Sequence, residues 1–375
     1  MKRIKTALCL ALILLMSTVL SGCKYNVRLS DMSIVQGLSV DYENKKTSLC
    51  VQYLDLSKGT GTTDKLESNI TSVKSGFADN INQCVSTTSA GLSKPLFFGQ
   101  NKVIVFGFDY VINGIDDIGY ILEGVNSRPD VLVAVCEQKG EDMIKSKENN
   151  ARVPAQSLFE KIRTGEQIGN SVTVSVNDVV NLVESETSDL YLPLFTVSQD
   201  NSECSGIAVF SSNDYAASLN ETESFGFLLI KNLIDGANIT VYDKEFGNVG
   251  IEITSSKARN KAYYDNDRVV MQTNLTMKLT LNDAQKTTDS RIDTEDAKRI
   301  EKLVNKRAEQ MCKSADEKCF SNKSDPFMLG KMLAKSNYSV YKEKENAWRE
   351  NLPLVEYQIN VKSNVRMTDE SYRQG

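Results

Sequence analysis

A near-regular alternation of apolar and polar side chains between Val269 and Leu281 constrains the fold more than any other feature of this sequence. Successive side chains of a β-strand point to opposite faces, so this pattern predicts one long strand with one buried face. A half-buried strand is typical of an antiparallel sheet that has one face in water. The first face carries Val269, Met271, Thr273, Leu275, Met277, Leu279 and Leu281, and the second carries Gln272, Asn274, Lys278 and Thr280.

Further strands and helices are expected around this strand. Residues 249–253 and 355–365 alternate in the same way, and the second of these segments is expected to join the same sheet. Asp293 or Thr294 can cap a helix that extends to Met311, and a second helical stretch, with a break near Asn337, is expected from Asp325 to Trp348. The second half is therefore predicted to be a largely antiparallel sheet packed against long helices.

The first half alternates between short apolar runs and helical patterns, which predicts mixed α/β units. Strands are expected at residues 34–40, 48–54, 102–106, 131–135 and 172–176, and helices at 73–85, 112–122 and 154–163. A chain of 375 residues suggests two domains at roughly 150 residues each. The polar stretch 198–205 is the expected boundary. The prediction is a multi-domain α+β protein with domains at 24–200, which can divide into two lobes, and 201–370.

The N-terminus has the pattern of a bacterial export signal. Basic residues precede an apolar run from Ala7 to Leu20, and this run is shorter than the roughly 20 residues that a membrane-spanning helix needs. The following Leu-Ser-Gly-Cys resembles a lipobox, which implies removal of residues 1–22 and attachment of lipid to Cys23. Loss of this segment changes the net charge from −5 to −8, so acyl chains rather than basic patches are expected to anchor the protein.

Six cysteines remain after Cys9 is removed with the signal and Cys23 takes the lipid. They are Cys50, Cys84, Cys136, Cys204, Cys312 and Cys319. Six cysteines allow 15 pairings, and the sequence does not choose among them. Cys312 and Cys319 form the only local candidate pair. Cys50 and Cys136 are expected to be buried strand residues.

The sequence contains no histidine, which removes the commonest general base and all histidine-ligated metal sites. With 49 acidic against 44 basic residues, non-specific binding to nucleic acid is also disfavoured. The pairs Asp116–Asp117 and Glu295–Asp296 are better explained as solvated helix ends than as catalytic carboxylates. Residues 265–267 predict a hairpin turn rather than a calcium loop. Neither a cofactor nor a metal site is predicted, and the loop with Gly59 and Gly61 lacks a phosphate-binding pattern.

Several blocks of the chain, in this order, carry a resemblance to one family. They are residues 29–41 after Cys23, Leu96-Phe97-Phe98-Gly99 before 103–107, Arg128 before 131–135, Leu192-Pro193, residues 206–210 with 223–226, Asp325, Phe327, Gly330, Trp348, Pro353 and residues 355–365. Together they resemble the Ger(x)C family of spore germination lipoproteins, the C subunit of the bacterial spore germinant receptor. The aromatic block at 96–99 and Trp348 can be partner contacts or ordinary core residues.

The resemblance implies a non-catalytic subunit on the outer face of the spore inner membrane. It also implies a complex with an A subunit and an integral-membrane B subunit, and a response to small nutrients that starts germination. A solute-binding lipoprotein of an uptake transporter is the alternative, although the long alternating strand disfavours its two similar α/β lobes. A lipid-anchored hydrolase would need a Ser-Lys or carboxylate mechanism, and no Ser-x-x-Lys is found in a convincing helix-start context.

Overall fold

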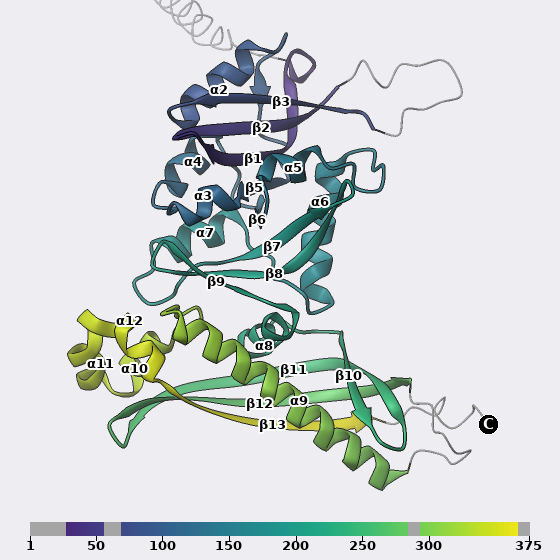
Figure 1. Ribbon diagram of the computed structural model, residues 1–375, viewed down its shortest axis with the longest axis vertical. Coiled ribbons are helices and arrows are strands. Elements are labelled where there is room, and N and C mark those ends of the chain that lie inside the picture. Colours follow the sequence, from purple (N-terminus) through teal and green to yellow (C-terminus); the bar gives the residue numbers. More distant parts are fainter. Residues whose placement is uncertain (1–27, 56–68, 284–292, 367–375) are drawn as a thin grey trace, which may run out of the picture.

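The computed structural model describes residues 28–55, 69–283 and 293–366, which form an elongated body with one sheet above the other (Figure 1). The predicted signal segment, Cys23 and the loop with Gly59 and Gly61 lie outside these described residues. Within them, no helix has the length and apolar character needed to cross a membrane.

The first sheet has a parallel centre and antiparallel margins. Within the described ranges its nine strands follow the order β3-β2-β1-β5-β6-β7-β8-β9, and β4 pairs with β1. Strands β1, β5, β6 and β7 are parallel, whereas β2, β3, β8 and β9 are joined by antiparallel pairing. The strands are β1 (Ser33–Glu43), β2 (Lys46–Leu54), β3 (Thr71–Ala78), β4 (Leu96–Phe97), β5 (Val103–Gly107), β6 (Leu132–Cys136), β7 (Tyr191–Ser198), β8 (Asn201–Ser211) and β9 (Asp214–Leu219).

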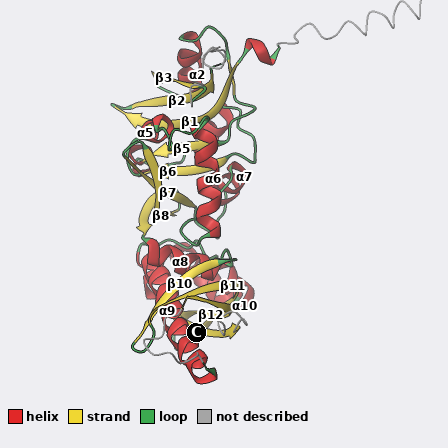
Figure 2. Ribbon diagram, turned by 90° about the vertical axis from the view of Figure 1, so that its right-hand side faces the viewer, coloured by secondary structure: helices red, strands yellow, loops and turns green. Residues whose placement is uncertain are grey.

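Helices cover both faces of this sheet, as Figure 2 shows from the side. Buried residues of α5 and α6 pack on one face with those of β5 and β6, and α2, α3, α4 and α7 belong to the core of the other face. The helices are α2 (Ile81–Ala90), α3 (Phe108–Ile112), α4 (Ile118–Gly124), α5 (Gly140–Lys145), α6 (Pro154–Gln167) and α7 (Val176–Val183), and the 3-10 turn η1 (Leu29–Asp31) precedes β1. Pro154 opens α6 as the sequence predicts.

Two expectations for the first half are wrong. Val73 and Phe77 lie on strand β3 and not on a helix, because a spacing of four residues also places side chains on one face of a strand. Residues 172–175 form no strand and contribute only an isolated bridge between Leu132 and Ser175, and Val176 already begins α7. Ser175 then caps α7 through a capping box with Asp178.

Strands β7 and β8 form one hairpin through residues 199 and 200, both with positive φ. The predicted boundary after residue 200 falls in this turn, and the residues on its two sides share a sheet. The chain passes from the first sheet to the second between Leu219 and Ala237, through helix α8 (Glu221–Lys231). The division into domains at 24–200 and 201–370 stays a prediction.

The second sheet follows the order β10-β11-β12-β13. Its first three strands are an antiparallel meander, as the alternation predicts, and β13 joins in parallel to β12. The 28-residue helix α9 packs along β13 and across α8. The elements are β10 (Ala237–Asp243), β11 (Gly247–Asp265), β12 (Arg268–Asp283), α9 (Thr294–Ser321) and β13 (Glu356–Arg366). This arrangement confirms the α+β fold class.

Helices α8 and α9 cross in close contact at Gly226. A Cβ atom at this position would lie 2.0 Å from the carbonyl oxygen of Met311, so only glycine permits this approach. The apolar residues of α8 and α9 belong to one buried cluster that also includes residues of both sheets. The two sheets therefore share a continuous core and do not form two separately packed bodies.

Short helices close the left end of the second sheet in Figure 1. They are α10 (Leu329–Ser336), α11 (Tyr338–Lys344), η3 (Glu345–Ala347), α12 (Trp348–Asn351) and η4 (Leu352–Leu354). Asn337 ends α10 and caps α11, which confirms the predicted break. Trp348 is buried and Phe98 of the 96–99 block is 8% exposed, so both are core residues.

Candidate functional site at the junction of the two sheets

The junction holds two buried aspartates that bind groups far apart in the sequence. Asp189 precedes β7, and Asp325 lies between α9 and α10; each is 2% exposed. The Asp325 N–H donates to a carboxylate oxygen of Asp189 at 2.6 Å, and the Asp189 N–H donates to the Asp325 carbonyl at 3.1 Å. This pair joins the first sheet to the C-terminal helices.

Asp189 also binds the positive charge of Arg349. An Arg349 guanidinium nitrogen lies 2.6 Å from one oxygen of the Asp189 carboxylate, and the Ser212 N–H donates to the other oxygen at 2.9 Å. Because the Arg349 side chain is only 32% exposed, this ion pair is partly shielded from water. Helix α12 is thereby fixed to the lower edge of the first sheet.

Asp325 fixes helices α10 and α12. Its carboxylate accepts the N–H groups of Leu329 and Gly330 in the first turn of α10, and the Trp348 indole N–H at 3.1 Å. Burial raises the pKa of Asp325 to about 6, although these three donors act against the shift. Gly330 permits the contact with the indole, because a Cβ there would lie 3.1 Å from the Trp348 ring.

Lys231 at the end of α8 completes the junction. Its ammonium group donates to the Pro326 carbonyl at 3.0 Å and lies 4.6 Å from the centre of the Tyr191 ring. Burial lowers the pKa of Lys231 to about 8. Every polar group described here is held by a partner within the chain, so the arrangement positions structural elements and presents no free acid, base or nucleophile.

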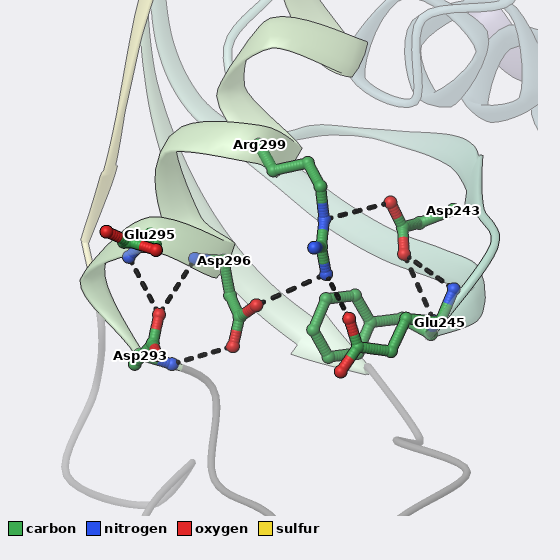
Figure 3. A network of polar contacts seen from close by, with 7 residues as sticks. Asp243, Glu245, Asp293, Glu295, Asp296 and Arg299 are labelled. Carbon is green, nitrogen blue, oxygen red and sulfur yellow. Dashed lines mark hydrogen bonds and ion pairs between the residues drawn. The ribbon is translucent and has the colours of Figure 1, made fainter.

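A second charged network connects β10 to the start of α9 (Figure 3). The Arg299 guanidinium contacts Asp243 at 3.2 Å, Glu245 at 2.8 Å and Asp296 at 3.2 Å. Asp293 caps the helix, as predicted, by accepting the N–H groups of residues 295 and 296. The pair Glu295–Asp296 therefore belongs to a helix start, where carboxylates interact well with the helix dipole.

The other predicted positions also have structural partners. Asp116 accepts the Asn213 side-chain amide, and Asp117 accepts the Tyr110 hydroxyl. Residues 265–267 form the β11–β12 turn, with positive φ at Asn266 and Asp267. In the described part of the chain, no group of three or more acidic or cysteine side chains is arranged to hold a metal ion.

All six cysteines in the described ranges are free thiols. The candidate pair Cys312–Cys319 does not form, because two turns of α9 separate the residues by roughly 10 Å, beyond the reach of a disulfide. Cys50 and Cys136 are buried in strands, as predicted, and burial raises the pKa of each thiol to about 12. Thiols in such surroundings are poor nucleophiles.

Comparison with known proteins gives concordant results. A family model described as spore germination protein N-terminal domain matches residues 26–197, and one described as spore germination B3/GerAC like, C-terminal, matches residues 205–369. Spore germination protein GerQC of Bacillus cereus is 21% identical over 355 residues, which cover 93% of this chain and 96% of the relative. The crystal structure of the GerBC protein matches with a TM-score of 0.60 and 16% identity, over 89% of this chain and 98% of that one, which shows a shared fold.

Proposed function

Because the chain belongs to the family of GerAC-like spore germination proteins, we propose that it is a non-catalytic, lipid-anchored subunit of a receptor that starts germination in response to nutrients. Its role in germination follows from the family itself. The receptor role is supported above all by the likeness to GerQC, which extends over nearly the full length of both chains. Because the likeness extends along the whole chain, we expect this protein and GerQC to have the same role.

The non-catalytic role is supported by the chemistry of the buried groups. The chain has no histidine, and the two aspartates of the junction are engaged by backbone, indole or guanidinium groups. Such contacts bind elements together and leave no carboxylate pair facing a substrate cleft. The body then acts by assembly with an A subunit and an integral-membrane B subunit. No nucleic-acid partner is proposed.

The membrane attachment is proposed to be a lipid on Cys23, with the body on the outer face of the spore inner membrane. A Cys23→Ala variant should carry no lipid, and it should be absent from membrane fractions of cells that lack the A and B subunits. The test is metabolic labelling with a fatty acid, together with fractionation. Full membrane retention of the unlabelled variant would argue against the anchor.

The receptor role is tested by deletion of the coding sequence in the producing strain, combined with deletion of any similar receptor subunits. Nutrient-triggered germination should be lost for at least one nutrient and restored by the intact chain. Germination by a route that bypasses receptors should remain normal. Unchanged responses to every nutrient would contradict the proposal.

A solute-binding lipoprotein of an uptake transporter remains the second candidate, carried by the predicted lipobox alone. Its class has two similar α/β lobes, whereas the second sheet here is an antiparallel meander with one added parallel strand. Loss of uptake of one solute in the deletion strain, with normal germination, would favour this second candidate.

A further inference from the structure

A cavity of about 600 Å³ lies where the β11–β12 turn meets the start of β13. Four segments form it: the turn at Asp267–Val269, residues 351 and 353–357, Lys313 of α9 and Lys344 of α11. Its volume lies in the range of small-molecule sites, which is roughly 300–1,000 Å³. None of these residues belongs to the junction network.

The charged residues of the cavity leave a positive excess in an acidic protein. Arg268 and Glu356 approach to 3.9 Å and offset each other, which leaves Lys313 and Lys344 against Asp267. Lys313 forms no ion pair with any residue in the described ranges. The Lys344 ammonium lies 5.6 Å from the centre of the Tyr264 ring, a contact that leaves it able to bind an anion.

Apolar residues also line the cavity. They are Val269 and Val355, which are buried, and Pro353 and Leu354. Leu354 is 70% exposed, whereas the next residue, Val355, is buried. An exposed leucine beside a cavity with a cationic side is the arrangement expected for a ligand with one charged end and an apolar body.

We propose that this cavity binds a small organic carboxylate, whose anionic end lies between Lys313 and Lys344 and whose apolar part contacts Pro353 and Leu354. This site is independent of the proposed receptor role, because binding can be measured on the isolated protein whether or not germination depends on the chain. The ligand class follows from charge and shape, since a carboxylate offers the acceptors that two ammonium groups require.

The cavity also has a structural connection to the junction. Asn351 lines the cavity at the end of α12, and Arg349 of the same helix binds Asp189 beneath the first sheet. A carboxylate that contacts residues 351–354 therefore touches the segment that joins the C-terminal helices to the rest of the body. Binding is expected to increase hydrogen-exchange protection in residues 348–354.

The test is calorimetric titration of the full-length protein in detergent with hexanoate and benzoate, each beside its neutral amide, hexanamide or benzamide. At least one carboxylate should bind with a Kd of about 1 mM or tighter, and its amide should bind at least about tenfold more weakly. The double variant Lys313→Gln/Lys344→Gln should weaken carboxylate binding at least about tenfold, since charge-assisted hydrogen bonds are lost. Leu354→Asn should weaken binding of hexanoate through loss of apolar contact.

The matched control is Lys306→Gln, an exposed lysine two turns earlier on α9 that does not line the cavity. It removes the same charge from the same helix and should leave the Kd unchanged. Three results would overturn the proposal: no carboxylate binds to the unmodified protein, the amides bind equally well, or the double variant binds no more weakly than the Lys306→Gln control.

Discussion

Asp316 lies in the second half of α9 with its entire side chain buried. Neither carboxyl oxygen has a hydrogen-bond partner among the described residues. Its titratable neighbours are Cys312 and Cys319 on the same helix and Tyr357 on β13, none of which is a cation. Burial raises the pKa of Asp316 well above its ordinary value of 3.8, so the folded chain keeps this acid protonated to a higher pH than the unfolded chain does.

The protonated acid makes the folded state less stable as the pH rises. Above pH 3.8 the unfolded chain releases this proton and the folded chain keeps it. The free energy of unfolding therefore falls by about 1.4 kcal/mol for each pH unit, up to the raised pKa of the folded state. Asp316→Asn keeps the shape and removes the ionisation, so the variant should be the more stable protein at neutral pH.

The assay is thermal unfolding of the Asp316→Asn variant and the unmodified chain, followed by circular dichroism between pH 5 and pH 7. The difference in the free energy of unfolding should grow by about 1.4 kcal/mol per pH unit, or about 2 °C in Tm for a chain of 375 residues. Glu317→Gln is the matched control, because the neighbouring residue on the same helix is exposed. Its Tm should follow that of the unmodified chain at every pH.

The reasoning would be refuted by a variant that is less stable than the unmodified chain at pH 7. A Tm difference that stays constant between pH 5 and pH 7 would refute it equally. Either result would mean that the Asp316 carboxyl has a partner or access to water in the folded chain.

Three further predictions follow from the packing. Gly226→Ala should destabilise the protein by at least about 2 kcal/mol in chemical denaturation, because a Cβ would overlap the Met311 carbonyl. The control Gly119→Ala should be neutral or slightly stabilising, because a Cβ at this position of α4 would meet open space. Arg349→Met should lower the free energy of unfolding by about 2–3 kcal/mol and reduce hydrogen-exchange protection near Asp325, because Asp189 loses its charged partner. Lys323→Gln, which breaks the exposed Lys323–Glu350 pair, should lower it by less than about 1 kcal/mol. The six described thiols should react slowly with a soluble disulfide reagent in the native protein, and rapidly in denaturant without prior reduction. If two of these cysteines stayed unreactive in denaturant, they would be joined in a disulfide, and the assignment of six free thiols would be wrong.

Local patterns were sufficient to predict most of the second half. In the alternation from Val269 to Leu281, every residue of the first face is buried and most residues of the second face are half-buried or exposed, so its period corresponds to burial. The same type of evidence failed at β3, where Val73 and Phe77 are 36% and 51% exposed on an edge strand. Apolar spacing marks a face only when that face is buried, and an edge strand need not bury one.

The junction site could not be predicted from local sequence. Asp189 binds partners 136 and 160 positions away in the chain, and no motif around it indicates either contact. Asp325 and Trp348 were identified through the family resemblance, without their mutual hydrogen bond. Cys23 lies outside the described residues, so its lipid remains a prediction from the lipobox.

The shared core of the two sheets has a mechanical consequence. Domains joined by a flexible linker swivel, and the distance between their far ends fluctuates. Here α8 is part of the connection itself, and its buried side chains belong to the same cluster as those of both sheets. The body should therefore be rigid along its length, so that a partner bound at its lower end stays at a constant distance from its upper end.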